Sequence, residues 1–213
     1  MTRQLGPAMA CLFWAVVAAA PAGAQSASAL CKRGVSLYGQ HKLREAEAAF
    51  RAAIKADARS FEAHSGLGVV LYAMGKTDGA IEAWRAALKI DPRSASVHSN
   101  LGAALTKKGK TAEAIAACRQ AIKLKPKFPG AYLNLGRAYY TAGRHRDAVN
   151  AYNSAIKIDA RFADAWLNLG WTYAKGLNDS KQAVRAFKEY LRLTPEPNDC
   201  TCLLKDYIAK HDR

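Results

Sequence analysis

One sequence pattern recurs every 34 residues through most of this 213-residue chain. Its fixed point is a glycine, found at Gly34, Gly68, Gly102, Gly136 and Gly170. Self-similarity at a period of this length indicates a solenoid built from small repeated units. One such unit cannot cover its own apolar face, so neighbouring units must stack. The period therefore indicates a stack of similar units rather than a single globular core.

Other positions recur in phase with the glycine. Small residues stand twelve places after it, at Ala46, Ala80, Ala114 and Ala148. Larger residues, which we call the wedge residues, stand sixteen places after it, at Phe50, Trp84, Cys118 and Tyr152. Alanine returns nineteen places after it, at Ala53, Ala87, Ala121 and Ala155. The fifth unit runs one residue late, with Ala183 and the wedge residue Phe187, and we expect residues 175–181 to absorb the extra residue.

Turn residues divide each unit into two helices. Gly75, Gly109 and Gly143 follow the first helix, where glycine accepts the left-handed conformation at little steric cost. Pro92 and Pro126 follow the second helix, because proline disfavours helix at the preceding residue. No run of alternating β-branched residues indicates a strand, so the sequence predicts an all-α protein.

These positions together resemble the tetratricopeptide repeat (TPR) family over residues 27–195. The resemblance implies a right-handed superhelical solenoid of five helix pairs within residues 25–197. The predicted repeats are 27–60, 61–94, 95–128, 129–162 and 163–197. Residues 198–213 carry apolar residues at helical spacing and are expected to form a capping helix over the last repeat.

The N-terminal residues 1–24 have the pattern of a secretory signal peptide. Arg3 precedes an apolar run over 8–20, and Ala22-Gly23-Ala24 forms a small-x-small cleavage site. The run is too short to span a bilayer comfortably, although an uncleaved anchor stays open as the alternative. We therefore expect cleavage after Ala24 and a periplasmic or secreted protein, similar to small exported bacterial TPR proteins.

The candidate binding residues are three asparagines at one repeat position, Asn100, Asn134 and Asn168. The resemblance implies that this position faces a concave groove. An amide there can both donate to and accept from a peptide backbone. The same helices offer further groove candidates at Tyr72, Tyr140, Arg137, Lys107 and Lys175. The alternative is that the asparagines bond locally and only stabilise the fold.

The family's subgroup that clamps a C-terminal carboxylate uses lysine and asparagine on three repeats. Gly66, Gly130 and Asp164 stand at the positions that would need those residues. The chain therefore departs from that pattern, and carboxylate-tail binding is not carried over to it.

A second candidate surface, the basic ridge, follows from the net charge of +15. Repeated cations mark the second helices, at Arg51, Lys55, Arg85, Lys89, Arg119, Lys123, Lys157, Lys188 and Arg192. Such a surface could attract anionic lipid, acidic glycans or nucleic acid, and predicted export disfavours nucleic acid. The alternative is a solvated outer face.

Cysteine and histidine chemistry provides the third candidate. Cys118 replaces a bulky wedge residue and is expected to be a buried apolar filler. Cys200 and Cys202, with His211, could form a strained bridge or bind a soft metal, but the spacing matches no established redox or zinc motif. His64 and His98 share one repeat position. Each is expected to be a packing residue whose imidazole ring has one polar edge.

The chain shows no nucleophile, base and orienting acid in a recognisable spacing, and no phosphate-binding loop. The sequence thus predicts a non-catalytic protein-protein interaction scaffold that uses no cofactor or metal and binds a protein or peptide in its groove. The alternatives are an envelope-surface binder of anionic ligands through the basic ridge, or a thiol or metal protein. The sequence does not predict an oligomeric state.

Overall fold

The structure, a computed structural model, describes residues 26–195 and 199–212, with the side chains of 199 and 200 left out. The predicted signal peptide lies outside the described residues. Every regular element among them is a helix, which confirms the all-α prediction. The helices are α1 (Ala27–Gly39), α2 (Leu43–Ala56), α3 (Phe61–Ala73), α4 (Thr77–Ile90), α5 (Ala95–Lys107), α6 (Thr111–Leu124), α7 (Pro129–Thr141), α8 (His145–Ile158), α9 (Ala163–Trp171), η1 (Thr172–Gly176), α10 (Ser180–Leu193) and α11 (Asp199–His211).

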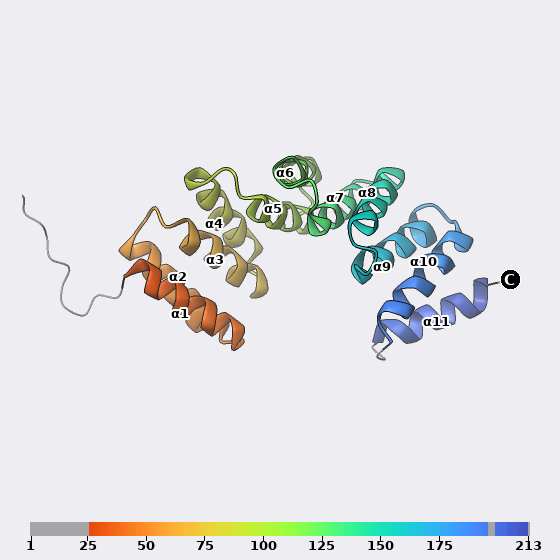
Figure 1. The fold of residues 1–213 in the computed structure, drawn as a ribbon, viewed down its shortest axis with the longest axis horizontal. Helices are drawn as coiled ribbons and strands as arrows, with labels where there is room; N and C mark the ends of the chain where they lie inside the picture. Colours follow the sequence, from red (N-terminus) through yellow and green to blue (C-terminus); the bar gives the residue numbers. More distant parts are fainter. Residues whose placement is uncertain (1–25, 196–198, 213) are drawn as a thin grey trace, which may run out of the picture.

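The helices form an arch of stacked antiparallel pairs (Figure 1). The first helix of each pair, α1, α3, α5, α7 or α9, lies on the inner side, and its partner lies on the outer side. Each first helix packs on its own partner and also on the first helix of the next pair. This arrangement is the solenoid that the period predicts. No helix in the described part of the chain is long and apolar enough to cross a bilayer.

The wedge residues fill the space between neighbouring helices. Trp84 and Phe50 are 2% exposed, Tyr152 is 1% exposed, and Cys118 and Phe187 are fully buried. Each faces a repeat glycine so closely that a Cβ atom on the glycine would overlap its side chain. The glycine and the wedge residue are therefore complementary, and this pairing explains why both recur with the same period.

The turn inside each repeat places one residue in the left-handed conformation. Gly75, Gly109 and Gly143 have φ of 76°, 73° and 73°, which confirms their predicted role. The first and fifth repeats put other residues there: His41 has φ of 58° and Asn178 has φ of 53°. A left-handed residue other than glycine brings its Cβ close to the backbone and costs about 1–2 kcal/mol.

These turns support a paired stability prediction. Gly109→Ala should lower the free energy of unfolding by about 1 kcal/mol, because its φ is left-handed and the space around a new Cβ is open. His41→Gly should raise the free energy of unfolding by about 0.5–1 kcal/mol, because it relieves the same strain. Urea denaturation of both variants and of the wild type measures these free energies of unfolding. Equal midpoints for all three proteins would contradict the explanation.

The fifth repeat accommodates its extra residue in a π-helical turn. Residues Thr172–Gly176 follow α9 directly, and the Leu177 amide donates to the Thr172 carbonyl at 3.1 Å. A π-turn holds one residue more than an α-turn, so the insertion begins a few residues before the 175–181 segment that the sequence indicated. Asp179 then caps α10, because its carboxylate accepts from the Gln182 amide at 3.0 Å.

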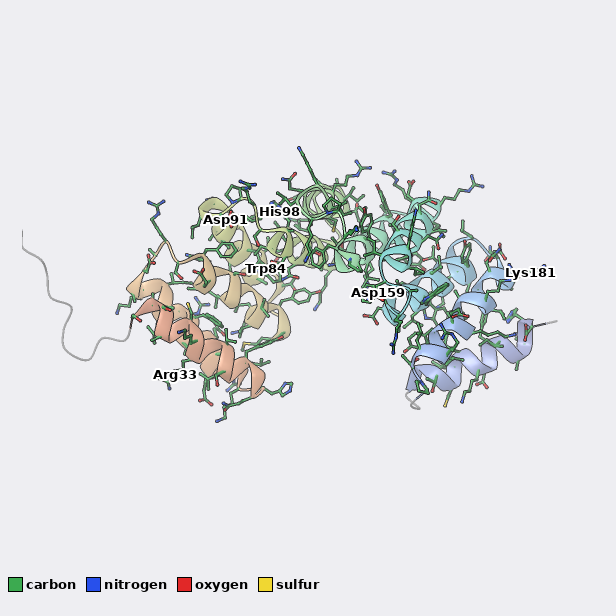
Figure 2. All side chains as sticks on the ribbon, viewed as in Figure 1. Arg33, Trp84, Asp91, His98, Asp159 and Lys181 are labelled. Atoms are coloured by element: carbon green, nitrogen blue, oxygen red, sulfur yellow. The ribbon has the colours of Figure 1, made fainter. Side chains whose placement is uncertain are left out.

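Connections between repeats are fixed by local hydrogen bonds. The Asp91 carboxylate accepts from the Arg93 amide at 2.9 Å, and Asp57 and Asp159 do the same in their own turns. The His98 ring nitrogen lies 3.0 Å from the Pro92 carbonyl oxygen, beside the labelled Asp91 in Figure 2. His64 makes the matching contact in its repeat. The expected role of these histidines, packing with one polar edge, is confirmed.

The last helix, α11, covers the end of the array against α10 (Figure 1). Leu204 is fully buried there, and the Tyr207 ring packs edge-on against Phe187 at 5.3 Å between centroids. This contact gives the last wedge residue the neighbour that a further repeat would have provided, as expected of a cap.

Candidate functional site: the concave groove

The inner side of the arch is lined by three positions in each repeat. They stand two residues before the repeat glycine, one residue after it and four residues after it, which is the spacing of one helix face. Side chains at these positions line three successive hollows along α1, α3, α5, α7 and α9. We call this row of hollows the groove.

The first hollow lies between α1 and α3 and encloses about 740 Å³. Its lining is mostly apolar and includes Val35 and Phe61. Cys31 lies in its wall, with its sulfur 3.9 Å from the Ser60 hydroxyl. Burial raises the pKa of the Cys31 thiol, so this cysteine is poorly suited to act as a nucleophile.

The middle hollow lies between α3 and α5 and encloses about 280 Å³. Two of the predicted groove residues, Tyr72 and Asn100, line it together with Tyr38. The Trp84 indole closes its floor and donates to the Ser65 carbonyl at 3.2 Å. The hollow therefore offers aromatic faces and one free amide.

The third hollow spans α5, α7 and α9 and encloses about 440 Å³. It brings together five of the candidate groove residues, which are Lys107, Arg137, Tyr140, Asn168 and Lys175. The Arg137 guanidinium donates to the Asn168 side-chain oxygen at 3.4 Å. The Asn168 amide nitrogen donates to the Asp164 carbonyl at 2.6 Å, one turn earlier on α9.

Aromatic rings support the cations at both ends of this hollow. The Lys175 ammonium lies 4.4 Å from the centre of the Trp171 ring, and the Lys107 ammonium lies 5.3 Å from the centre of the Tyr72 ring. These distances allow cation–π attraction. Lys107 thus connects the middle hollow to the third one.

The three asparagines do not share one environment. The Asn134 amide donates to both the hydroxyl and the carbonyl oxygen of Ser99, at 3.0 Å and 3.2 Å. It therefore ties α7 to α5. Asn100 and Asn168 line the middle and third hollows. A binding role for the three amides stays a prediction, and the amide nitrogens of both Asn134 and Asn168 already make local hydrogen bonds.

Sequence reasoning did not select Trp171 or Tyr38 as groove residues. Trp171 lines the third hollow and packs on Phe187 at 5.1 Å and on Tyr207 at 6.4 Å between centroids. A signal was present, because Trp171 directly follows its repeat glycine, as Arg137 does. Tyr38 follows its glycine by four residues, as Tyr72 and Tyr140 do.

Sequence profiles decide the family. Three TPR profiles match the chain: a "TPR repeat" profile at 70–109, 103–143 and 136–176, and two "tetratricopeptide repeat" profiles at 31–76 and 163–197. The chain belongs to the TPR family.

Solved TPR structures share this fold. A MamA protein is 28% identical, with a TM-score of 0.67, over 78% of this chain and 91% of its own. PilW, described as a widely conserved type IV pilus biogenesis factor, is 23% identical, with a TM-score of 0.80; the match covers 87% of this chain and 85% of PilW. YrrB, described as a TPR protein with an unusual peptide-binding site, is 20% identical, with a TM-score of 0.66; the match covers 87% of this chain and 92% of YrrB. No curated protein matches the chain.

The basic ridge of this TPR protein makes many internal contacts. Arg51 pairs with Glu47 at 2.9 Å, and Arg85 pairs with Glu113 at 2.6 Å. Lys188 and Arg192 also form ion pairs, and Arg119 donates to a tyrosine hydroxyl. These contacts satisfy part of the charge within the chain, which weakens the case for the ridge as a binding surface.

The cysteines fall into different surroundings. Cys118 is fully buried, and burial raises its pKa to about 12, so it remains a neutral thiol and serves as the expected filler. Cys202 is an exposed free thiol. The side chain of Cys200 lies outside the described residues, so the proposed pair stays untested. No group of three metal-ligating side chains gathers within the described part of the chain.

Proposed function

We propose that this chain is a non-catalytic interaction scaffold that binds an extended peptide segment of a partner protein in the groove. We further propose that it acts in the periplasm or outside the cell, after removal of residues 1–24. The observation that carries the proposal is the row of three hollows along the inner helices, which includes seven of the eight candidate groove residues. TPR proteins bind protein partners, and the description of YrrB names a peptide-binding site.

The shape of the groove favours an extended segment over a small molecule. The hollows follow one another across five helices and are open to solvent, whereas small-molecule sites enclose most of their ligand. The Asn100 amide can bond to a peptide backbone without regard to its sequence, and Asn168 keeps one N–H and one oxygen lone pair beyond its local bonds for the same purpose. Tyr72, Tyr140 and Trp171 supply faces for side chains.

The test is selection of short peptides from a random displayed library on the chain that begins at Gln25. Affinities of selected peptides are then measured by fluorescence anisotropy. We expect the Asn100→Ala/Asn168→Ala variant to bind at least about tenfold more weakly, because each lost hydrogen bond costs about 1 kcal/mol. Asn134 is left unchanged because its amide joins α5 to α7.

A matched control exists on the outer helices. Asn150 and Asn153 are exposed on α8, so the Asn150→Ala/Asn153→Ala variant removes two amides without touching the groove. It should bind selected peptides as the wild type does, with both variants showing unchanged circular dichroism. Failure to select any peptide, or equal affinity for the two variants, would overturn the proposal.

A further inference from the structure

The chemistry of the groove changes along its length. The position directly after the repeat glycine is Val35, Val69, Ala103, Arg137 and Trp171 in successive repeats. The first hollow is mostly apolar and is bordered by charges of both signs, Lys32, Asp57 and Glu62, whereas the third contains Lys107, Arg137 and Lys175 and no acidic residue. A segment lying along the groove therefore meets a mostly apolar hollow of mixed charge at one end and a purely cationic one at the other.

The three cations of the third hollow have no counter-charge beside them. No acidic residue lines this hollow, and the ion pairs formed among the described residues involve other cations. All three side chains are exposed. Neighbouring groups position them: Lys107 lies over Tyr72, Lys175 over Trp171, and Arg137 beside Asn168. They differ in this from the ridge arginines Arg51 and Arg85, which are paired.

The cations come from three successive repeats: Lys107 from α5, Arg137 from α7, and Lys175 from the π-turn η1 that continues α9. Packed helices lie about 8–10 Å apart, so Lys107 and Lys175 arise from helices about 16–20 Å apart. One carboxylate reaches only the cations within about 4 Å of it. With Lys107 over Tyr72 and Lys175 over Trp171, several carboxylates use the three cations better than a single chain-terminal carboxylate does.

We infer that the third hollow recognises acidic side chains of an extended peptide, with aspartate or glutamate at about every third residue. A chain in the extended polyproline II conformation has three residues per turn and advances about 3.1 Å per residue. Every third side chain therefore points the same way, about 9 Å further along, which matches the step from one inner helix to the next. This inference rests on the proposed function and names the chemical class of the segment that the groove binds.

The probe is a peptide of three Glu-Tyr-Ser units, acetylated and amidated at its ends and labelled for fluorescence anisotropy in low-salt buffer. Its control has glutamine in place of each glutamate. We expect the glutamate peptide to bind at least tenfold more tightly than the glutamine peptide. The preference should shrink as salt is added, because salt screens exposed charges. Equal binding of the two peptides would overturn the inference.

Matched charge variants locate the effect. Lys107→Gln/Lys175→Gln should remove most of the preference for the glutamate peptide. Lys55→Gln/Lys123→Gln changes the net charge equally on the outer helices α2 and α6, where both lysines are exposed, and should leave the preference intact. An equal loss in both variants would show general charge attraction and overturn the inference.

A third peptide distinguishes the source of the carboxylate. The glutamine peptide with a free C-terminus carries one terminal carboxylate, and we expect it to bind as weakly as the amidated glutamine peptide. Binding as tight as that of the glutamate peptide would overturn the inference. Library peptides that need Asn100 and Asn168 but carry no acidic residues would also overturn it, while the proposed function would stand.

Discussion

Trp84→Ala is expected to lower the free energy of unfolding by about 3–5 kcal/mol, the cost typical of deleting a buried tryptophan side chain. Trp84 is 2% exposed and lies between its own helix pair and α5 (Figure 2). Its removal leaves a cavity where two repeats meet and takes the hydrogen-bond donor from the Ser65 carbonyl. Urea denaturation followed by circular dichroism measures the change.

The position of Trp84 in the array adds a second expectation. Because each repeat contacts only its neighbours, the loss of local stability in Trp84→Ala should be largest in the repeats beside the cavity. Hydrogen exchange should therefore quicken in α3, α4 and α5 more than in α9 and α10. Leu203→Ala, at a site that is 63% exposed, is the control and should change stability by less than about 0.5 kcal/mol. A Trp84→Ala loss no larger than this control would contradict the wedge role.

Gly136→Ala is expected to lower the free energy of unfolding by about 2–3 kcal/mol through overpacking. A Cβ atom at this position would lie 2.7 Å from Cδ1 and 2.8 Å from Cζ of the Tyr152 ring. That ring is rigid and 1% exposed, so it has little room to move. In a chain of this size the melting temperature should fall by about 5–10 °C, which thermal denaturation measures.

The chain contains its own control for this glycine. A Cβ on Gly39, the last residue of α1, meets no atom within 4 Å. Gly39→Ala should therefore leave stability unchanged or raise it by up to about 1 kcal/mol, because alanine restricts the unfolded chain. If Gly136→Ala and Gly39→Ala gave the same melting temperature, close packing against Tyr152 would not be the reason for the repeated glycine.

The sequence contained most of the fold, because the fold depends on positions that recur. Glycines such as Gly75 and wedge residues such as Trp84 occupy their expected places, since one set of contacts repeats along the array. The departures are single events. His41 occupies a left-handed turn without glycine, and the extra residue of the fifth repeat enters a π-turn at Thr172–Gly176. Neither follows from the period, because each depends on how its local contacts compensate.

The candidate site was only partly predictable. Helix periodicity placed Lys107, Arg137, Tyr140 and Asn168 on one surface, and the structure gathers them around one hollow. Periodicity could not show that Asn134 turns its amide to Ser99, because that choice depends on the distance between α5 and α7. It also could not show how Trp171 is supported, because its neighbour Tyr207 comes from the capping helix.

The wedge residue Cys118 has a mechanical consequence. The two neighbouring clusters of buried residues interlock around it, because one cluster includes both Ala117 and Ala138 and the next begins at Cys118. Cysteine has far fewer atoms than the aromatic wedge residues, so its own dispersion attraction is smaller. Close packing of α5 on α7 and the hydrogen bonds from Asn134 to Ser99 hold this joint instead. The arch is therefore expected to resist bending there, so that Lys107 and Arg137 keep a fixed spacing which a ligand has to match.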